Sequence, residues 1–74
     1  MTKRPRSLSG RKVEKALLRL GFRFDRQTGS HRILVRDRPL ATVPVPDHPE
    51  IGPGLLGAIV KQAGLTMDEF LAAL

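Results

Sequence analysis

The sequence predicts an α+β fold, in which helices pack on one face of a three-stranded antiparallel sheet. Apolar residues recur at helical spacing near both ends of the chain, whereas residues 22–46 alternate apolar and polar side chains as strands do. The 74 residues are 41% hydrophobic and 27% charged, which suits one small folded domain. We expect a mobile basic arm at residues 1–7 and a single domain at residues 8–74.

The first helix is expected over about residues 9 to 20. Ser9 is a favourable N-terminal cap, and Gly21 supplies the left-handed residue that often follows a helix. The basic residues of this segment fall largely on the side opposite its apolar face. That apolar face consists of Val13, Ala16, Leu17 and Leu20.

Three extended segments follow, and their sequences are FRFDRQT, HRILVR and ATVPVP. Gly29 and Ser30 provide a turn after the first, and DRP provides one after the second, so the segments should form an antiparallel meander. Pro44 and Pro46 have no N–H to donate to a neighbouring strand. The third strand should therefore lie at a sheet edge or be interrupted near its end.

A loop rich in proline and glycine, DHPEIGPG, leads into the second main helix. Pro53 suits the first turn of that helix, and Gly64 suits its end. Thr66 and Glu69 have the spacing of a capping box, which predicts a short third helix. The apolar faces of these two helices should contain Leu55, Leu56, Ile59, Val60 and Ala63, and then Met67, Phe70, Leu71 and Leu74.

The net charge of +6 is unevenly distributed along the chain. Residues 1–40 contain 12 of the 13 lysines and arginines and carry a charge of +9, whereas residues 41–74 carry −3. Clustered cations favour a polyanionic partner, because they release condensed counterions from phosphates. We expect no membrane partner, since no helix combines this charge with a large exposed apolar face. Without cysteines, and with no signal-peptide or membrane-span pattern, we expect a cytoplasmic protein.

Histidine chemistry offers the main route to catalysis in this sequence. The chain has two histidines, and His48 lies beside Asp47 at a spacing that does not suit a metal site, so we expect neither metal nor cofactor. A histidine with its ordinary pKa of about 6.5 exchanges a proton near neutral pH. RNA supplies its own nucleophile, the 2′-hydroxyl, so one such residue with a cationic clamp can cleave RNA without a metal.

His31 follows a turn that suits a phosphate. Glycine at position 29 lets a phosphate approach the backbone closely, and the amides of Gly29 and Ser30 with the Ser30 hydroxyl can donate to its oxygens. Arg26 and Arg32 flank this turn in the sequence. From the residues alone, His31 is either a general acid or base or an ordinary surface residue at the start of a strand.

Several motifs occur in order over residues 8–72. They are a Ser-Gly before a basic helix that ends in Leu-Gly-Phe, a Gly-Ser-His turn, Val-Pro followed by Pro-x-His, and Ile-x-Lys-Gln-Ala-Gly-Leu. In this order they resemble the HicA family of small bacterial toxins. The resemblance implies a fold like that of double-stranded-RNA-binding domains and a ribonuclease that cleaves messenger RNA, with His31 as its catalytic residue. It also implies a HicB-type antitoxin that covers this histidine, with the toxin alone expected to be monomeric.

RNA contacts are expected from the first helix and the hairpin, because EIGPGLLGAIVKQ contains only Lys61 as a cation. The expected contacts are Gly29 and Ser30 together with Arg11, Lys12, Lys15, Arg26, Arg32 and Arg36. His48 is expected to have a structural or binding role. Two other functions stay open, namely a module that binds structured RNA without cutting it and a basic protein that binds an acidic partner.

Overall fold

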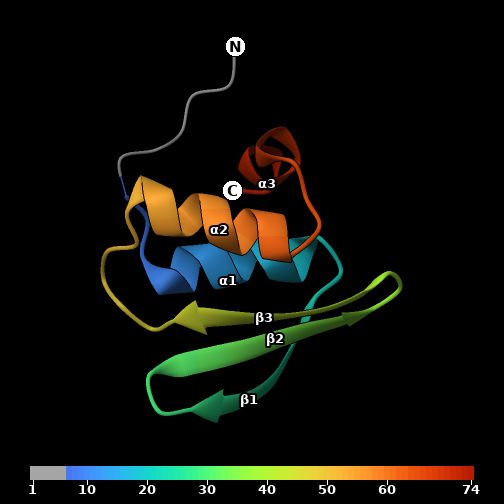
Figure 1. Ribbon diagram of the computed structural model, residues 1–74, viewed down its shortest axis with the longest axis horizontal. Helices are drawn as coiled ribbons and strands as arrows, with labels where there is room; N and C mark the ends of the chain where they lie inside the picture. Colours follow the sequence, from blue (N-terminus) through green and yellow to red (C-terminus); the bar gives the residue numbers. More distant parts are fainter. Residues whose placement is uncertain (1–6) are drawn as a thin grey trace.

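The computed structural model describes residues 7–74 and confirms the predicted order of elements. Those elements are α1 (Gly10–Arg19), β1 (Arg23–Thr28), β2 (His31–Asp37), β3 (Leu40–Pro46), α2 (Pro53–Gln62) and α3 (Met67–Ala72) (Figure 1). Residues 1–6 lie outside the described residues, so the basic arm predicted at residues 1–7 stays a prediction.

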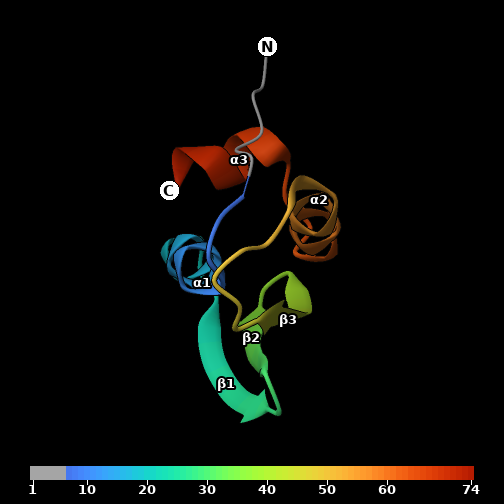
Figure 2. The ribbon, with the colours of Figure 1, turned by 90° about the vertical axis from the view of Figure 1, so that its left-hand side faces the viewer.

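The sheet has the order β1-β2-β3 and is antiparallel throughout, so β2 is central and β3 is an edge strand, as its prolines predicted. Figure 2 shows α1 and α2 side by side over one face of the sheet, with α3 above both helices. The opposite sheet face carries no helix. This one-sided packing confirms the predicted α+β architecture and agrees with the fold of double-stranded-RNA-binding domains.

Local signals set the helix ends where the sequence predicted them. The Ser9 hydroxyl accepts a hydrogen bond from the amide of Lys12, which satisfies one of the free N–H groups in the first turn of α1. Before α3, the Thr66 hydroxyl accepts from the Glu69 amide, and the Glu69 carboxylate accepts from the Thr66 amide. Both caps therefore follow from residues within one helical turn.

The core lies between the sheet and the helices, and Phe70 of α3 closes it from above. Its largest fully buried side chains are Phe70, Leu17, Leu34, Ile51, Leu56, Val13, Val43 and Val45. Two residues predicted on the apolar helix faces, Leu55 and Leu74, are 47% and 46% exposed, and Phe24 in the first strand is 41% exposed. Phe24 pairs with the buried Leu34 and so lies on the helix side of the sheet, but it belongs to the edge strand β1, where every residue is exposed and where the Arg32 guanidinium covers its ring.

Candidate functional site

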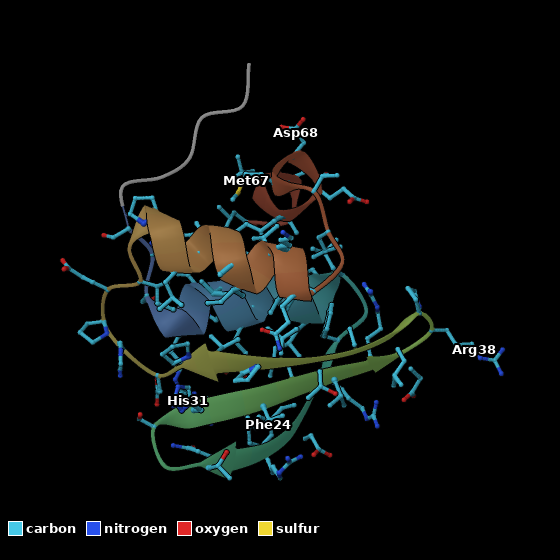
Figure 3. All side chains as sticks on the ribbon, in the orientation of Figure 1. Phe24, His31, Arg38, Met67 and Asp68 are labelled. Atoms are coloured by element: carbon cyan, nitrogen blue, oxygen red, sulfur yellow. The ribbon has the colours of Figure 1, made fainter. Side chains whose placement is uncertain are left out.

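His31 is the first residue of the central strand β2, where three elements of the fold meet. It is paired with Thr28 of β1 on one side and with Pro46 of β3 on the other, and it is exposed. Figure 3 shows it at the end of the sheet where β3 finishes. We call this end of the sheet, formed by residues 28–31 and 46–48 and the start of α1, the His31 corner.

The alternation of side chains along β2 places His31 on the open face of the sheet. Leu34 is fully buried in the core, so Arg32, two residues away, points toward the helices as well. Ile33 faces the other way and lies outside the core cluster, although its neighbours bury it. His31 shares the side of Ile33, and Arg26 of β1, the pairing partner of Ile33, lies on this side too.

The turn before His31 is a two-residue hairpin loop, and a hydrogen bond from the segment after β3 holds it in place. Gly29 has a φ of 58°, and a positive φ at the first loop position is typical of the type II′ turns that join antiparallel strands. The amide of Asp47 donates a hydrogen bond to the carbonyl of Ser30, with 2.7 Å between nitrogen and oxygen. The turn is therefore attached to the segment that follows β3.

The start of α1 packs against the same corner. The amide of Gly10 donates to the carbonyl of His48 at 2.8 Å, and a Cβ atom on Gly10 would lie only 2.0 Å from the carbonyl oxygen of Pro46. The guanidinium of Arg11 donates to both carboxylate oxygens of Asp47, at 3.1 and 3.3 Å. Contacts with α1 thus fix the backbone at residues 46–48, while the side chain of His48 is exposed.

Arg32 lies on the helix side of the sheet and not beside His31. Its guanidinium donates to both carboxylate oxygens of Glu14 in α1 and to the side-chain oxygen of Gln27, and it stacks 4.1 Å from the centre of the Phe24 ring. The hydrogen bond to the Glu14 carboxylate raises the pKa of Arg32 above its ordinary value. The structure therefore ties Arg32 to α1 and does not bring it together with His31.

Some of the other predicted RNA-binding cations contact groups of the protein itself, whereas others are exposed without an acidic partner in the described residues. Arg36 donates to the carbonyls of Pro39 and Ala63, at 2.9 and 3.0 Å. Arg26 is paired with its neighbour Asp25 at 2.6 Å. Lys12 and Lys15 are exposed on α1 and pair with no carboxylate among residues 7–74.

Sequence reasoning missed three residues that build this corner. The sequence marks Gly10 only as part of a motif and Asp47 only as a possible metal ligand, and nothing in it marks Thr28, which faces His31 across the hairpin. The position of Thr28 follows from the two-residue loop, since such a loop pairs the residues on either side of it. The contacts of Gly10 and Asp47 join segments more than 15 residues apart, and no local pattern predicts them.

Within residues 7–74, no three histidine, cysteine, aspartate or glutamate side chains come together as a metal site. No helix there is long and apolar enough to cross a membrane.

A family model described as "HicA toxin of bacterial toxin-antitoxin" matches residues 10–65, which include α1, the whole sheet and α2. The matched region contains the His31 corner. No curated protein shows a significant match to the chain.

Proposed function

The chain belongs to the HicA toxin family and is therefore a toxin with an antitoxin partner. From this premise we propose that it cleaves messenger RNA, that His31 is the general acid or base, and that no metal takes part. We also propose that the partner is a HicB-type antitoxin that covers His31.

The exposure of His31 at a firmly held corner is the observation that carries this proposal. Among residues 7–74, its imidazole has no hydrogen-bond or ion-pair partner, so it is available to a bound substrate. The neighbouring turn is attached to Asp47, and the Asp47 segment is attached to α1. A catalytic group needs this kind of support, because small displacements of the reacting groups lower the rate strongly.

Cleavage would use the nucleophile that RNA carries. The 2′-oxygen attacks the adjacent phosphorus, a bond from this oxygen to phosphorus forms, and the bond from phosphorus to the 5′-oxygen breaks. His31 takes the proton of the 2′-hydroxyl while water protonates the departing 5′-oxygen, or His31 protonates the 5′-oxygen while water accepts the proton of the 2′-hydroxyl. The products are a 2′,3′-cyclic phosphate and a free 5′-hydroxyl.

The charged and polar groups around the phosphate would come from the open face of the corner. The amides of Gly29 and Ser30 and the Ser30 hydroxyl lie next to His31 in the chain, and Arg26 lies on the same face two residues before Thr28. We propose that these groups stabilise the charge that develops on the phosphate oxygens. The roles of Arg11, Lys12, Lys15, Arg32, Arg36 and His48 in RNA binding stay predictions, and Arg32 and Arg36 would act through the donors that their internal contacts leave free.

The chemistry of the cut ends tests the mechanism. Purified toxin should cleave RNA in excess chelator and leave 2′,3′-cyclic phosphate and 5′-hydroxyl ends. A substrate with a single 2′-deoxynucleotide before the cut bond should resist cleavage at that bond only. Cleavage that stops in chelator, or that proceeds at the deoxy position, would contradict the mechanism. Intact RNA after prolonged incubation with binding-competent protein would instead favour the module that binds RNA without cutting it.

A further inference from the structure

The cations of the described chain differ in what they contact. Most arginines near the sheet have an acidic or carbonyl partner, as the pairs Arg11 with Asp47, Arg23 with Asp37 and Arg32 with Glu14 illustrate. In contrast, Lys12 and Lys15 are exposed and pair with no carboxylate among residues 7–74. Uncompensated positive charge therefore accumulates along the outer side of α1.

These lysines line a groove of about 370 Å³ between α1 and the two ends of the described chain. Lys12, Lys15 and Arg19 are spaced by three and four residues, so they lie along one side of the helix. Leu8 precedes the helix, and Leu74 follows α3 and is 46% exposed. We call this feature the α1 groove, which is lined by Leu8, Lys12, Lys15, Arg19 and Leu74.

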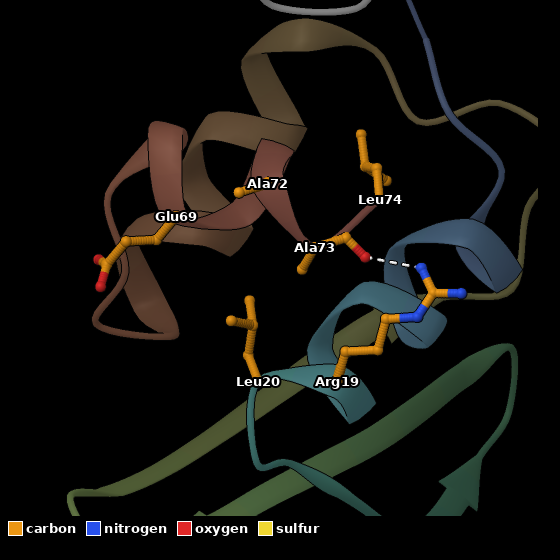
Figure 4. A pocket seen from close by; sticks show the side chains of 6 residues that line it. All are labelled: Arg19, Leu20, Glu69, Ala72, Ala73 and Leu74. Atoms are coloured by element: carbon orange, nitrogen blue, oxygen red, sulfur yellow. Dashed lines mark hydrogen bonds between the residues drawn. The ribbon is translucent and has the colours of Figure 1, made fainter.

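An internal hydrogen bond shapes one end of the α1 groove. A guanidinium nitrogen of Arg19 donates to the carbonyl oxygen of Ala73 at 2.8 Å, as the dashed line in Figure 4 shows. This bond attaches the end of α3 to α1 and places Leu74 beside the cations. Because Arg19 is held in this way, less side-chain entropy would be lost when a partner binds there.

We propose that the α1 groove binds an acidic, amphipathic segment of the antitoxin partner. Carboxylates on such a segment would pair with Lys12 and Lys15, and an apolar side chain would cover Leu74 and Leu8. RNA would satisfy the cations only, because a phosphate backbone gains nothing from an exposed leucine. The combination of unpaired lysines and an apolar floor therefore favours a protein segment over RNA.

The α1 groove lies on a different side of the molecule from His31. Figure 2 shows α1 between the sheet and α3, and the groove is on the α3 side of α1, whereas His31 faces away from the helices. The segment bound in the groove would therefore hold the toxin at a second place, apart from the part of the antitoxin that covers the His31 corner. The inference rests on the antitoxin partner that the family implies and does not depend on RNA cleavage.

Calorimetric titration of the toxin with its antitoxin partner tests the proposal. The double variant Lys12→Glu, Lys15→Glu should weaken binding by roughly 10- to 100-fold, because two attractions become repulsions. Leu74→Ser should weaken it by about tenfold, because the variant loses apolar contact without losing charge. The control Arg38→Glu, Lys61→Glu makes the same change in net charge outside the groove and should stay within about twofold, since salt screens distant charges.

The control variants distinguish an antitoxin segment from RNA as the occupant of the α1 groove. Thermal unfolding of each variant checks that it folds, and these side chains are exposed enough to tolerate replacement. Equal weakening by the groove and control pairs would show that only net charge matters and would overturn the inference. Loss of RNA affinity in the Lys12, Lys15 variant without loss of antitoxin affinity would assign the groove to RNA and would also overturn it.

Discussion

Replacing Gly10 by alanine tests whether α1 and the end of β3 form the His31 corner as described. Gly10 is the first residue of α1 and has a negative φ, so alanine suits its backbone and would ordinarily stabilise the helix by about 0.4 to 1 kcal/mol. The structure predicts the opposite result. An added Cβ would lie 2.0 Å from the Pro46 carbonyl oxygen and 3.3 Å from the Asp47 Cα, both of which are backbone atoms.

The size of the effect follows from these contacts. Relief of such an overlap requires backbone movement, which typically costs about 1 to 3 kcal/mol. The same movement weakens the hydrogen bond from Gly10 to His48, which contributes about 0.5 to 1.5 kcal/mol. After the helical gain of alanine is subtracted, these terms leave a loss between about 0.5 and 4 kcal/mol, and we expect Gly10→Ala to lower the free energy of unfolding by about 2 kcal/mol. For a domain of this size the melting temperature should fall by about 10 °C.

Thermal and urea unfolding followed by circular dichroism measures this change. Gly54→Ala is the matched control, because Gly54 also lies in the first turn of a helix but has no atom within 4 Å of the added Cβ. The control should be neutral or stabilising by up to about 1 kcal/mol. If Gly10→Ala proves as stable as Gly54→Ala, the close packing of α1 on Pro46 is wrong, and so is the account of how the corner is held.

Two further changes test local features of the fold. Gly29→Ala should lower the free energy of unfolding by about 1 to 2 kcal/mol because of the positive φ in the hairpin loop, whereas Ser30→Ala should change it by less than about 0.5 kcal/mol; equal effects in urea unfolding would contradict the turn geometry. Thr66→Ala should cost about 1 kcal/mol by removing the α3 cap, and the exposed Ser7→Ala serves as its control in the same measurement.

The elements of the fold could be predicted from the sequence because their signals are local. The helix caps formed by Ser9 and by Thr66 with Glu69 involve residues within one helical turn. The prolines of the third strand lack an N–H, which favours an edge position whatever the order of the strands in the sheet. The side of the sheet on which Arg32 lies was also predictable, since adjacent residues on a strand point to opposite faces. Proximity of Arg32 to His31 in the sequence therefore does not place the two side chains on the same face.

The partners of the charged residues could not be predicted in the same way. Arg11 and Asp47 are 36 residues apart, and Glu14 and Arg32 are 18 apart, so their pairing depends on how α1 lies across the sheet. The spacing of apolar residues predicts which face of a helix or strand a residue occupies, but it does not predict which residue of another element that residue contacts. The exposure of Phe24 likewise depends on the place of β1 at the sheet edge, which its alternating sequence does not reveal.

The proposed role of His31 is tested most directly by the rate at which three purified proteins cleave one messenger RNA in excess chelator. His31→Ala should be slower than the unmodified toxin by about 10² to 10⁴-fold, which is the usual contribution of a general acid or base. His48→Ala, which removes the other histidine and keeps its backbone carbonyl, should stay within about tenfold, because the corner uses His48 through that carbonyl. Undiminished cleavage by folded His31→Ala would contradict the account.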